Sequence, residues 1–306
     1  MRSVLLWMAR NPWLRRRIPR LWLARRAVRR FMPGEDPEVA LDVGRGFARE
    51  GIGTLFTRLG ENLTRMDEAD PTAAHYHEML GRIAALGLAG EISVKPTQLG
   101  LDLDVDATFV HLASLAERAA RDDGVVWLDM EGSAYTETTI ALYERLKADH
   151  ANVGICLQAY LRRSAADVQR LLPLEPAIRL VKGAYDEPAA IAYRSRREVD
   201  ASYAALAVAL LDARAAGRKV RLGLGTHDVG LIEQIAAHAA ALGLDRRSFE
   251  VQMLYGIRMD EQRRLANEGY RVIDLIAYGP AWYAWYMRRL AERPANVLFA
   301  VRQILG

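Results

Sequence analysis

The chain has 306 residues, of which 51% are hydrophobic and 26% charged, and its formal net charge is +4. This is the composition of an ordinary globular protein. The chain contains no run of about 18 apolar residues, so no membrane-spanning helix is predicted. The single cysteine, Cys156, excludes an intrachain disulfide and a cluster of thiolate metal ligands, and it agrees with a reducing compartment.

The first 34 residues are strongly basic. They contain ten arginines and no acidic residue, so the rest of the chain carries a net charge of −6. Tryptophan, leucine and isoleucine are interleaved with these arginines in WLRRRIPRLWLARRAVRRFM (13–32). Such a segment either lies on an anionic membrane or packs on its own domain, and the sequence leaves both interpretations open. A secretory signal is disfavoured because no small-residue cleavage site follows, and nucleic-acid binding because no recognised motif accompanies the charge.

From residue 53 onward, eight short β-like runs alternate with amphipathic stretches rich in alanine and leucine. The runs are 54–59, 91–95, 125–130, 153–158, 178–183, 220–225, 249–254 and 271–276, and the helical stretches include 73–88, 106–121, 136–148, 198–216 and 228–242. Glycines 87, 217, 243 and 269 stand where helices should end. This pattern predicts a (β/α)8 barrel. An open doubly wound sheet usually has a G-x-G-x-x-G turn after its first strand, and none follows 54–59.

Polar residues stand at the ends of most of these runs. They are Lys95, Asp129, Gln158, Lys182 with Tyr185, Thr226 with His227, and Gln252. In a barrel, the C-terminal ends of all strands open at one mouth, so the sequence predicts an active site there. No second histidine or carboxylate stands at ligand spacing from His227, so we expect no metal site. Ser133 lacks the context of a catalytic triad, which disfavours acyl transfer.

Seven motifs follow one another in the order SVKPTQLGLD (93–102), LDMEGSAY (128–135), LQAYLRRS (157–164), RLVKGAYDEP (179–188), LGTHD (224–228), FEVQMLYGIR (249–258) and RRLAERPAN (288–296). Together they resemble the flavin-dependent proline dehydrogenases over roughly residues 30–300. The resemblance implies a (β/α)8 barrel with FAD at the strand ends and the last helix over the mouth. We therefore expect a basic helical segment over residues 1–45 and an FAD-binding catalytic barrel over 46–306.

The resemblance also implies a reaction. L-proline would be oxidised to Δ1-pyrroline-5-carboxylate by hydride transfer from its C5 to N5 of FAD, and the electrons would pass to a membrane quinone. The expected location is the cytoplasm, or the inner face of the membrane with peripheral contact through residues 1–34. No nucleic-acid partner is expected.

The substrate carboxylate would be held by Lys95, Arg288 and Arg289, because guanidinium forks and an ammonium can bind it from several sides. Glu292, four residues after Arg288, would anchor that arginine. Asp129 would organise the hydrogen bonds of the site and help the substrate amine reach its neutral form. The other substrate-binding positions implied are Tyr185, Leu254, Leu275, Tyr278 and Trp285.

The flavin contacts implied by the resemblance lie on five strands and the segments that follow them. Arg179 would lie near N5 and stabilise the reduced flavin, while Met130 and Gln158 would contact the isoalloxazine. Arg196, with Arg194, would supply positive charge for the pyrophosphate. The remaining positions are Val181, Lys182, Gly183, Ala184, Thr226, His227 and Gln252.

Two positions depart from the family pattern. Leu275 and Trp285 stand where familiar members have tyrosines that line the proline ring. A changed ring pocket leaves hydroxyproline, or another cyclic or N-alkyl amino acid, as an alternative substrate. Two other classes are a barrel that has lost catalysis and a membrane-attached interaction protein. The second leaves the residues at the barrel mouth unexplained. The first is disfavoured because the whole set is retained: Lys95, Asp129, Arg179, Arg288 and Arg289.

Overall fold

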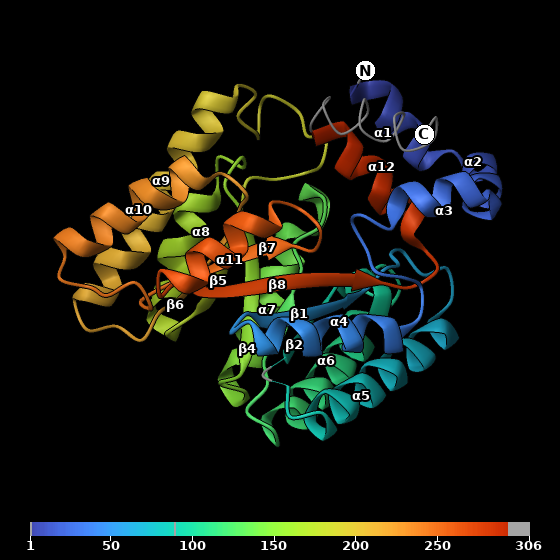
Figure 1. The fold of residues 1–306 in the computed structure, drawn as a ribbon, viewed down its shortest axis with the longest axis horizontal. Coiled ribbons are helices and arrows are strands. Elements are labelled where there is room, and N and C mark those ends of the chain that lie inside the picture. Colours follow the sequence, from blue (N-terminus) through green and yellow to red (C-terminus); the bar gives the residue numbers. More distant parts are fainter. Residues whose placement is uncertain (1, 89, 293–306) are drawn as a thin grey trace.

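The computed structural model describes residues 2–88 and 90–292, and eight parallel strands close into a barrel at its centre (Figure 1). The strands are β1 (Gly53–Arg58), β2 (Gly90–Val94), β3 (Val126–Leu128), β4 (Val153–Gln158), β5 (Ala177–Val181), β6 (Arg221–Gly225), β7 (Glu250–Leu254) and β8 (Arg271–Tyr278). Each pairs with its sequence neighbour, and β8 closes the ring against β1 with Leu55 opposite Leu275. The predicted barrel is therefore confirmed.

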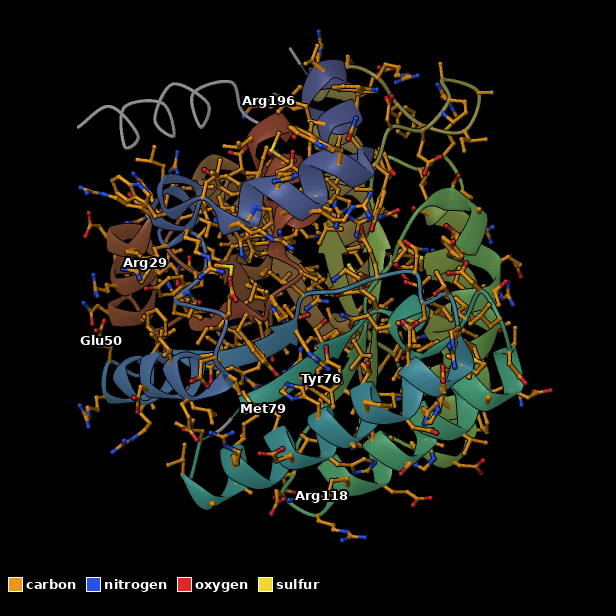
Figure 2. The ribbon with its side chains drawn as sticks, turned by 90° about the vertical axis from the view of Figure 1, so that its right-hand side faces the viewer. Arg29, Glu50, Tyr76, Met79, Arg118 and Arg196 are labelled. Atoms are coloured by element: carbon orange, nitrogen blue, oxygen red, sulfur yellow. The ribbon has the colours of Figure 1, made fainter. Side chains whose placement is uncertain are left out.

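Helices surround the strands as the alternation predicts. They are α4 (Pro37–Arg49), α5 (Ala69–Ala85), α6 (Val105–Ala120), α7 (Thr136–Asp149), α8 (Ser164–Leu171), α9 (Arg196–Ala215), α10 (Val229–Ala241) and α11 (Met259–Asn267). The glycines at 87, 217, 243 and 269 all have positive φ just after α5, α9, α10 and α11, as predicted for helix ends. In Figure 2, Tyr76 and Met79 lie on the side of α5 that faces the strands, whereas Arg118 of α6 lies at the outer surface.

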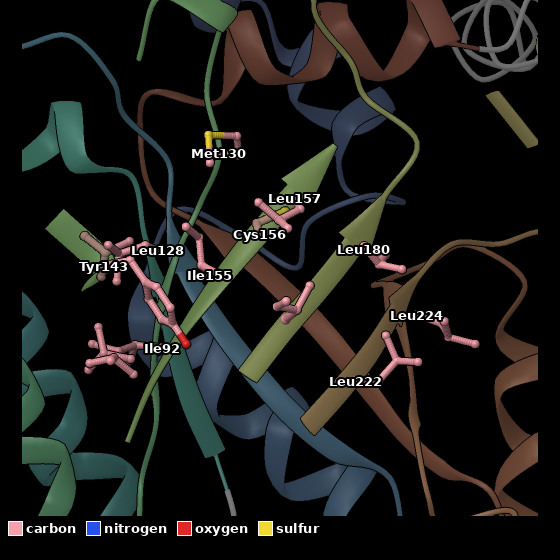
Figure 3. Close-up of a cluster of buried hydrophobic side chains, with 14 of the residues drawn as sticks. Ile92, Leu128, Met130, Tyr143, Ile155, Cys156, Leu157, Leu180, Leu222 and Leu224 are labelled. Carbon is pink, nitrogen blue, oxygen red and sulfur yellow. The ribbon is translucent and has the colours of Figure 1, made fainter. Parts of the chain in front are cut away.

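The barrel has two apolar layers. Most of the core lies between strands and helices, and the close-up in Figure 3 shows Ile92, Leu128, Ile155, Leu180 and Leu222 in that layer. A smaller cluster fills the barrel interior and consists of Leu55, Trp127, Ala177 and Ile273, with Val125 and Leu275 packed against it. The alternation of side chains along each strand assigns residues to one layer or the other.

The basic segment forms three short helices: α1 (Arg2–Arg10), α2 (Pro12–Arg17) and α3 (Trp22–Val28). Asn11 caps α2, because its Oδ1 accepts hydrogen bonds from the backbone N–H groups of Trp13 and Leu14 at 3.0 and 3.2 Å. These helices lie beside the last described helix, α12 (Trp282–Glu292), as Figure 1 shows at upper right.

An apolar cluster joins these helices to α12, and we call it the α12 cluster. Its buried members include Ala27, Val28, Phe31, Met32, Trp282, Tyr283, Trp285, Tyr286, Met287 and Leu290. One of the two interpretations left open by the sequence, packing on the own domain, is thus observed. The expected division at residues 45 and 46 falls within α4 and stays a prediction. None of the described helices is both long and apolar enough to cross a bilayer.

Candidate active site

Charged side chains from β2, β3 and β5 meet at the C-terminal end of the barrel. Arg179, inside β5, forms an ion pair with Asp129, which follows β3. Lys95 follows β2, and its Nζ lies 3.7 Å from Oδ2 of Asp129. Ser93 completes the group: its Oγ donates to Asp129 Oδ1 at 2.7 Å and accepts from Arg179 Nη2 at 2.7 Å. The predicted Lys95, Asp129 and Arg179 are therefore brought together.

This group is held in a largely dry environment. The side chain of Arg179 is 3% exposed and that of Lys95 10%, while Asp129 is 20% exposed. Burial acts to lower the pKa of Arg179, but the Asp129 carboxylate acts against it and the net pKa is raised. The arginine therefore remains a fixed cation, held by Ser93 of β2 and by Asp129, which follows β3.

Arg288 of α12 reaches over this mouth and is held by Glu61 from the segment after β1. The two Nη atoms of Arg288 each lie 2.8 Å from a carboxylate oxygen of Glu61. Both side chains are nearly buried. Burial acts to raise the pKa of Glu61, but Arg288, together with Lys95 and Arg15, acts against it and the net pKa is lowered, so the pair is charged. The guanidinium also lies over the ring of Tyr185, 5.7 Å from its centroid.

Two carboxylates of this mouth were not predicted from the sequence. Glu61 lies outside every motif, and its only signal is its place just after a strand end. Glu131 is 3% exposed and accepts hydrogen bonds from the N–H and Oγ1 of Thr97 at 3.1 and 2.7 Å. Burial raises the pKa of Glu131 to about 7. Its position within LDMEGSAY could have indicated it. Glu292 ends α12, and its side chain lies outside the described part of the chain, so its predicted role stays a prediction.

The ends of β4 and β7 offer two buried hydrogen-bond acceptors. Gln158 Nε2 donates to the carbonyls of Met130 and Glu131 at 3.2 Å, and Gln252 Nε2 donates to Glu250 at 2.9 Å. Among the described residues, the Oε1 atoms of both glutamines are buried without a hydrogen-bond partner. Such acceptors suit a planar heterocycle that carries N–H donors, which the isoalloxazine of FAD does. The residues present therefore fit a flavin.

At Gly183, two residues after the end of β5, the backbone packs closely against a neighbouring side chain. The φ of Gly183 is +113°, and a Cβ there would lie 2.2 Å from the ring of Tyr160. Only glycine allows this backbone path without strain. The neighbouring Lys182 is fixed by Asp200 and by Asp228, whose Oδ2 lies 2.9 Å from Nζ.

The basic residues predicted to bind FAD lie just after β5 and β6 and at the start of α9. Arg196 Nη2 lies 3.1 Å from the same Asp228 oxygen that binds Lys182, and its side chain is largely exposed. Arg194 pairs with Asp186 at 3.4 Å. Thr226 Oγ1 accepts a hydrogen bond from the backbone N–H of Asp228 at 3.2 Å. Lys182, Arg196 and Thr226 are thus linked through one aspartate, with His227 between Thr226 and that aspartate in the chain.

Not every predicted position joins the group. Tyr278 is 1% exposed, and its hydroxyl lies 2.8 Å from Nε2 of His75 in α5, on the outer side of the barrel. Leu275, three residues earlier, packs against the interior cluster and the α12 cluster instead. Trp285 is 8% exposed and belongs to the α12 cluster. The structure thus separates Tyr278 from the mouth and leaves Leu275 and Trp285 near it.

A family model described as Proline dehydrogenase matches residues 40–302. Proline dehydrogenase 1 of Bacillus subtilis (strain 168) is 34% identical over 306 residues, covering 100% of this chain and 99% of that protein. Proline dehydrogenase of Deinococcus radiodurans is 34% identical over 281 residues, covering 90% and 89%. Among solved structures, proline utilization A from Bdellovibrio bacteriovorus inactivated by N-propargylglycine superposes with a TM-score of 0.81 at 22% identity, covering 95% of this chain and 38% of that chain.

Proposed function

The chain belongs to the proline dehydrogenase family, and from this premise we propose that it oxidises L-proline to Δ1-pyrroline-5-carboxylate with FAD as cofactor. One observation carries the proposal: Lys95, Asp129 and Arg179 meet at the strand ends, beneath an arginine from α12. Three fixed cations around a mouth of this kind suit a small substrate that carries a carboxylate.

In the proposed complex, Lys95, Arg288 and Arg289 bind the substrate carboxylate. The guanidinium of Arg288 has five N–H donors, and Glu61 accepts from both of its Nη atoms. A substrate carboxylate can therefore accept from the N–H groups that Glu61 leaves unused, or displace Glu61. The Lys95 ammonium, only 10% exposed, adds a second charge whose attraction is little screened by water.

Asp129 is the group we propose to face the substrate amine. It already accepts from Ser93 and pairs with two cations, so it is held in place before substrate arrives. A carboxylate at that position orients the amine and can take up the proton that the amine must lose before the oxidation. Arg179, buried behind Asp129, supplies positive charge toward the place where reduced cofactor would carry negative charge.

When bound, FAD would accept a hydride from substrate C5 at its N5. Gln158, Gln252 and Met130 would hold the isoalloxazine, and Gly183 would let the ribityl chain approach the backbone. The Lys182, Arg196 and Thr226 group would hold the pyrophosphate end. Electrons would leave to a membrane quinone, and contact with the inner face of the membrane would be made through residues 1–34.

The test is the visible spectrum of the purified protein under anaerobic conditions, before and after addition of L-proline. Flavin bands near ~450 nm that bleach with L-proline are expected. A protein that cannot be loaded with FAD would contradict the cofactor assignment. Bands that persist with L-proline would contradict the substrate assignment alone.

Leu275 and Trp285 favour a second candidate substrate. Leu275 offers no hydroxyl, and its half-buried side chain packs against the barrel interior. A pocket altered in this way can shift preference among rings that differ by one methylene or hydroxyl by about 10–200-fold. Bleaching by hydroxyproline or an N-alkyl amino acid, ranked against L-proline, would decide between the two. Leu275→Tyr should move the ranking toward L-proline if this position sets specificity.

A further inference from the structure

Large apolar side chains stand exposed on the three N-terminal helices. Trp7, Trp13 and Trp22 are 61%, 61% and 67% exposed, and Val4 and Leu21 are similarly open. We call these five residues the outer side of the segment. The other three tryptophans of the chain, at 127, 282 and 285, are at most 8% exposed. Exposed tryptophan in this chain is therefore confined to residues 1–34.

The exposure is not the result of unpacked helices. On α1, Leu5, Met8 and Ala9 pack into the α12 cluster, while Val4 and Trp7 do not. The same division holds on α2, between Leu14 and Trp13, and on α3, between Ala27 with Val28 and Trp22. Each helix thus has an inner side already occupied by α12 and an outer side without a partner among the described residues.

The same segment also exposes positive charge. The exposed arginines of the segment are Arg15, Arg16, Arg17, Arg20, Arg25, Arg26, Arg29 and Arg30. Among the described ion pairs, one acidic residue contacts these arginines: Glu35, whose Oε1 lies 3.9 Å from Nε of Arg25. Tryptophan prefers the headgroup level of a bilayer, because its ring is apolar and its N–H is polar. Clustered arginines are attracted to anionic headgroups.

We propose that the outer side binds the surface of an anionic phospholipid bilayer, with the three tryptophans at headgroup level. The helices lie along the surface, because the longest has 9 residues and a span needs about 20. This inference rests on the membrane contact of the proposed function and names its surface and its lipid. The inner side packs against α12, which carries Arg288, so α12 would remain attached to the helices that bind the bilayer.

The test uses the full-length protein and vesicles of phosphatidylcholine with and without phosphatidylglycerol. Co-flotation should be strong with the anionic vesicles, weak with the neutral ones, and reduced by added salt. Tryptophan emission should shift to the blue and be quenched by brominated lipid, since the exposed tryptophans all lie in the segment. Trp7→Ala, Trp13→Ala and Trp22→Ala together should weaken binding by about 10-fold or more.

Two control variants separate the segment from the general surface. Val110→Ala removes another exposed apolar side chain, on α6, and should leave binding unchanged. Arg15→Gln, Arg16→Gln and Arg17→Gln should weaken binding to anionic vesicles, whereas Arg45→Gln, Arg49→Gln and Arg218→Gln, which are also exposed, should have little effect.

Equal binding by the triple tryptophan variant, or equal binding to neutral and anionic vesicles, would overturn the proposal. So would binding to a nucleic-acid duplex with no binding to vesicles. Flotation needs neither proline nor turnover, and bleaching of the flavin by proline needs no lipid. Failure of the one proposal is therefore distinguishable from failure of the other.

Discussion

Asp274 lies in β8, and its side chain is fully buried next to Gln262 of α11. Among the described residues, neither carboxyl oxygen has a hydrogen-bond partner, and Oε1 of Gln262 also lacks one. Burial raises the pKa of Asp274 to about 8, although Gln262 acts in the opposite direction. The folded protein therefore holds this group as a neutral acid that can donate to Gln262.

This raised pKa predicts how stability changes with pH. The unfolded chain loses the proton near pH ~4, whereas the folded chain keeps it until about pH 8, so the free energy of unfolding should fall between these values. Asp274→Asn keeps a donor for Gln262 and removes the titration. It should raise the free energy of unfolding at pH ~8 by about 1–3 kcal/mol and flatten this part of the pH profile.

Urea unfolding at several pH values measures this effect, with Asp260→Asn on the exposed side of α11 as control. An unchanged profile in Asp274→Asn would contradict a neutral Asp274.

Arg288 gives a second prediction at this scale. Its two parallel hydrogen bonds to Glu61 require a planar fork, which lysine cannot supply. On the proposed function, Arg288→Lys should raise the KM for proline by about 10-fold or more and leave bound FAD unchanged, because the described contacts of Arg288 are with Glu61 and Tyr185. Steady-state kinetics and flavin content check this, against Arg218→Lys. A KM equal to that of the parent protein would remove Arg288 from the carboxylate site.

The residues of the site differ in how far the sequence predicted them. Lys95, Asp129 and Arg179 lie at or near strand ends, so the barrel pattern alone brings them together. Tyr278 was placed with them, but it is an odd number of residues from Leu275 and so faces the opposite side of β8. Glu61 could not be predicted, because its partner is 227 positions away and no local pattern relates the two.

At the scale of elements, the periodicity of apolar residues and the glycines that end helices predicted most of the secondary structure. All eight predicted strands match within two residues at each end, and β3 stops at Leu128 because Asp129 and Met130 already belong to the loop. The N-terminal helices were predicted as amphipathic, but their partner was not. A pattern shows that a helix has an apolar side, and it does not show what covers that side.

One glycine determines how closely the N-terminal segment approaches the barrel. Gly256, after β7, has a φ of +75°, and a Cβ there would lie 1.5 Å from the carbonyl oxygen of Arg30. Gly256→Ala should therefore push the segment away and lower the free energy of unfolding, beyond the ~1 kcal/mol that alanine costs at positive φ.

Gly243→Ala is the matched control for this change. Its φ is +74°, and no atom lies within 4 Å of the added Cβ, so it meets the same backbone cost without the contact. Urea unfolding gives the difference between the two variants, and trypsin digestion of the arginine-rich segment reports its release. Equal losses of stability and equal digestion rates would show that the contact with Arg30 contributes nothing.

For the whole molecule, the two interpretations that the sequence presented as alternatives are compatible with each other. Residues 2–34 pack on their own domain through α12 and also leave tryptophans and arginines exposed. The inner side therefore supports the helix that carries Arg288, and the outer side is available to a membrane. Mutations should therefore be able to change vesicle binding by the outer side without changing the support that the inner side gives to α12.

Removal of residues 1–34 uncovers Trp282, Tyr286 and the rest of the α12 cluster. We therefore expect this deletion to lower Tm by several degrees and to raise the KM for proline, because α12 loses the surface that holds Arg288 over the mouth. The triple variant of Trp7, Trp13 and Trp22 keeps the inner side, so it should retain Tm and KM while it loses vesicle binding. Thermal unfolding and kinetics without lipid make the comparison. If the deletion leaves both Tm and KM unchanged, the segment does not support α12, and the link between the membrane-facing side and the barrel mouth fails.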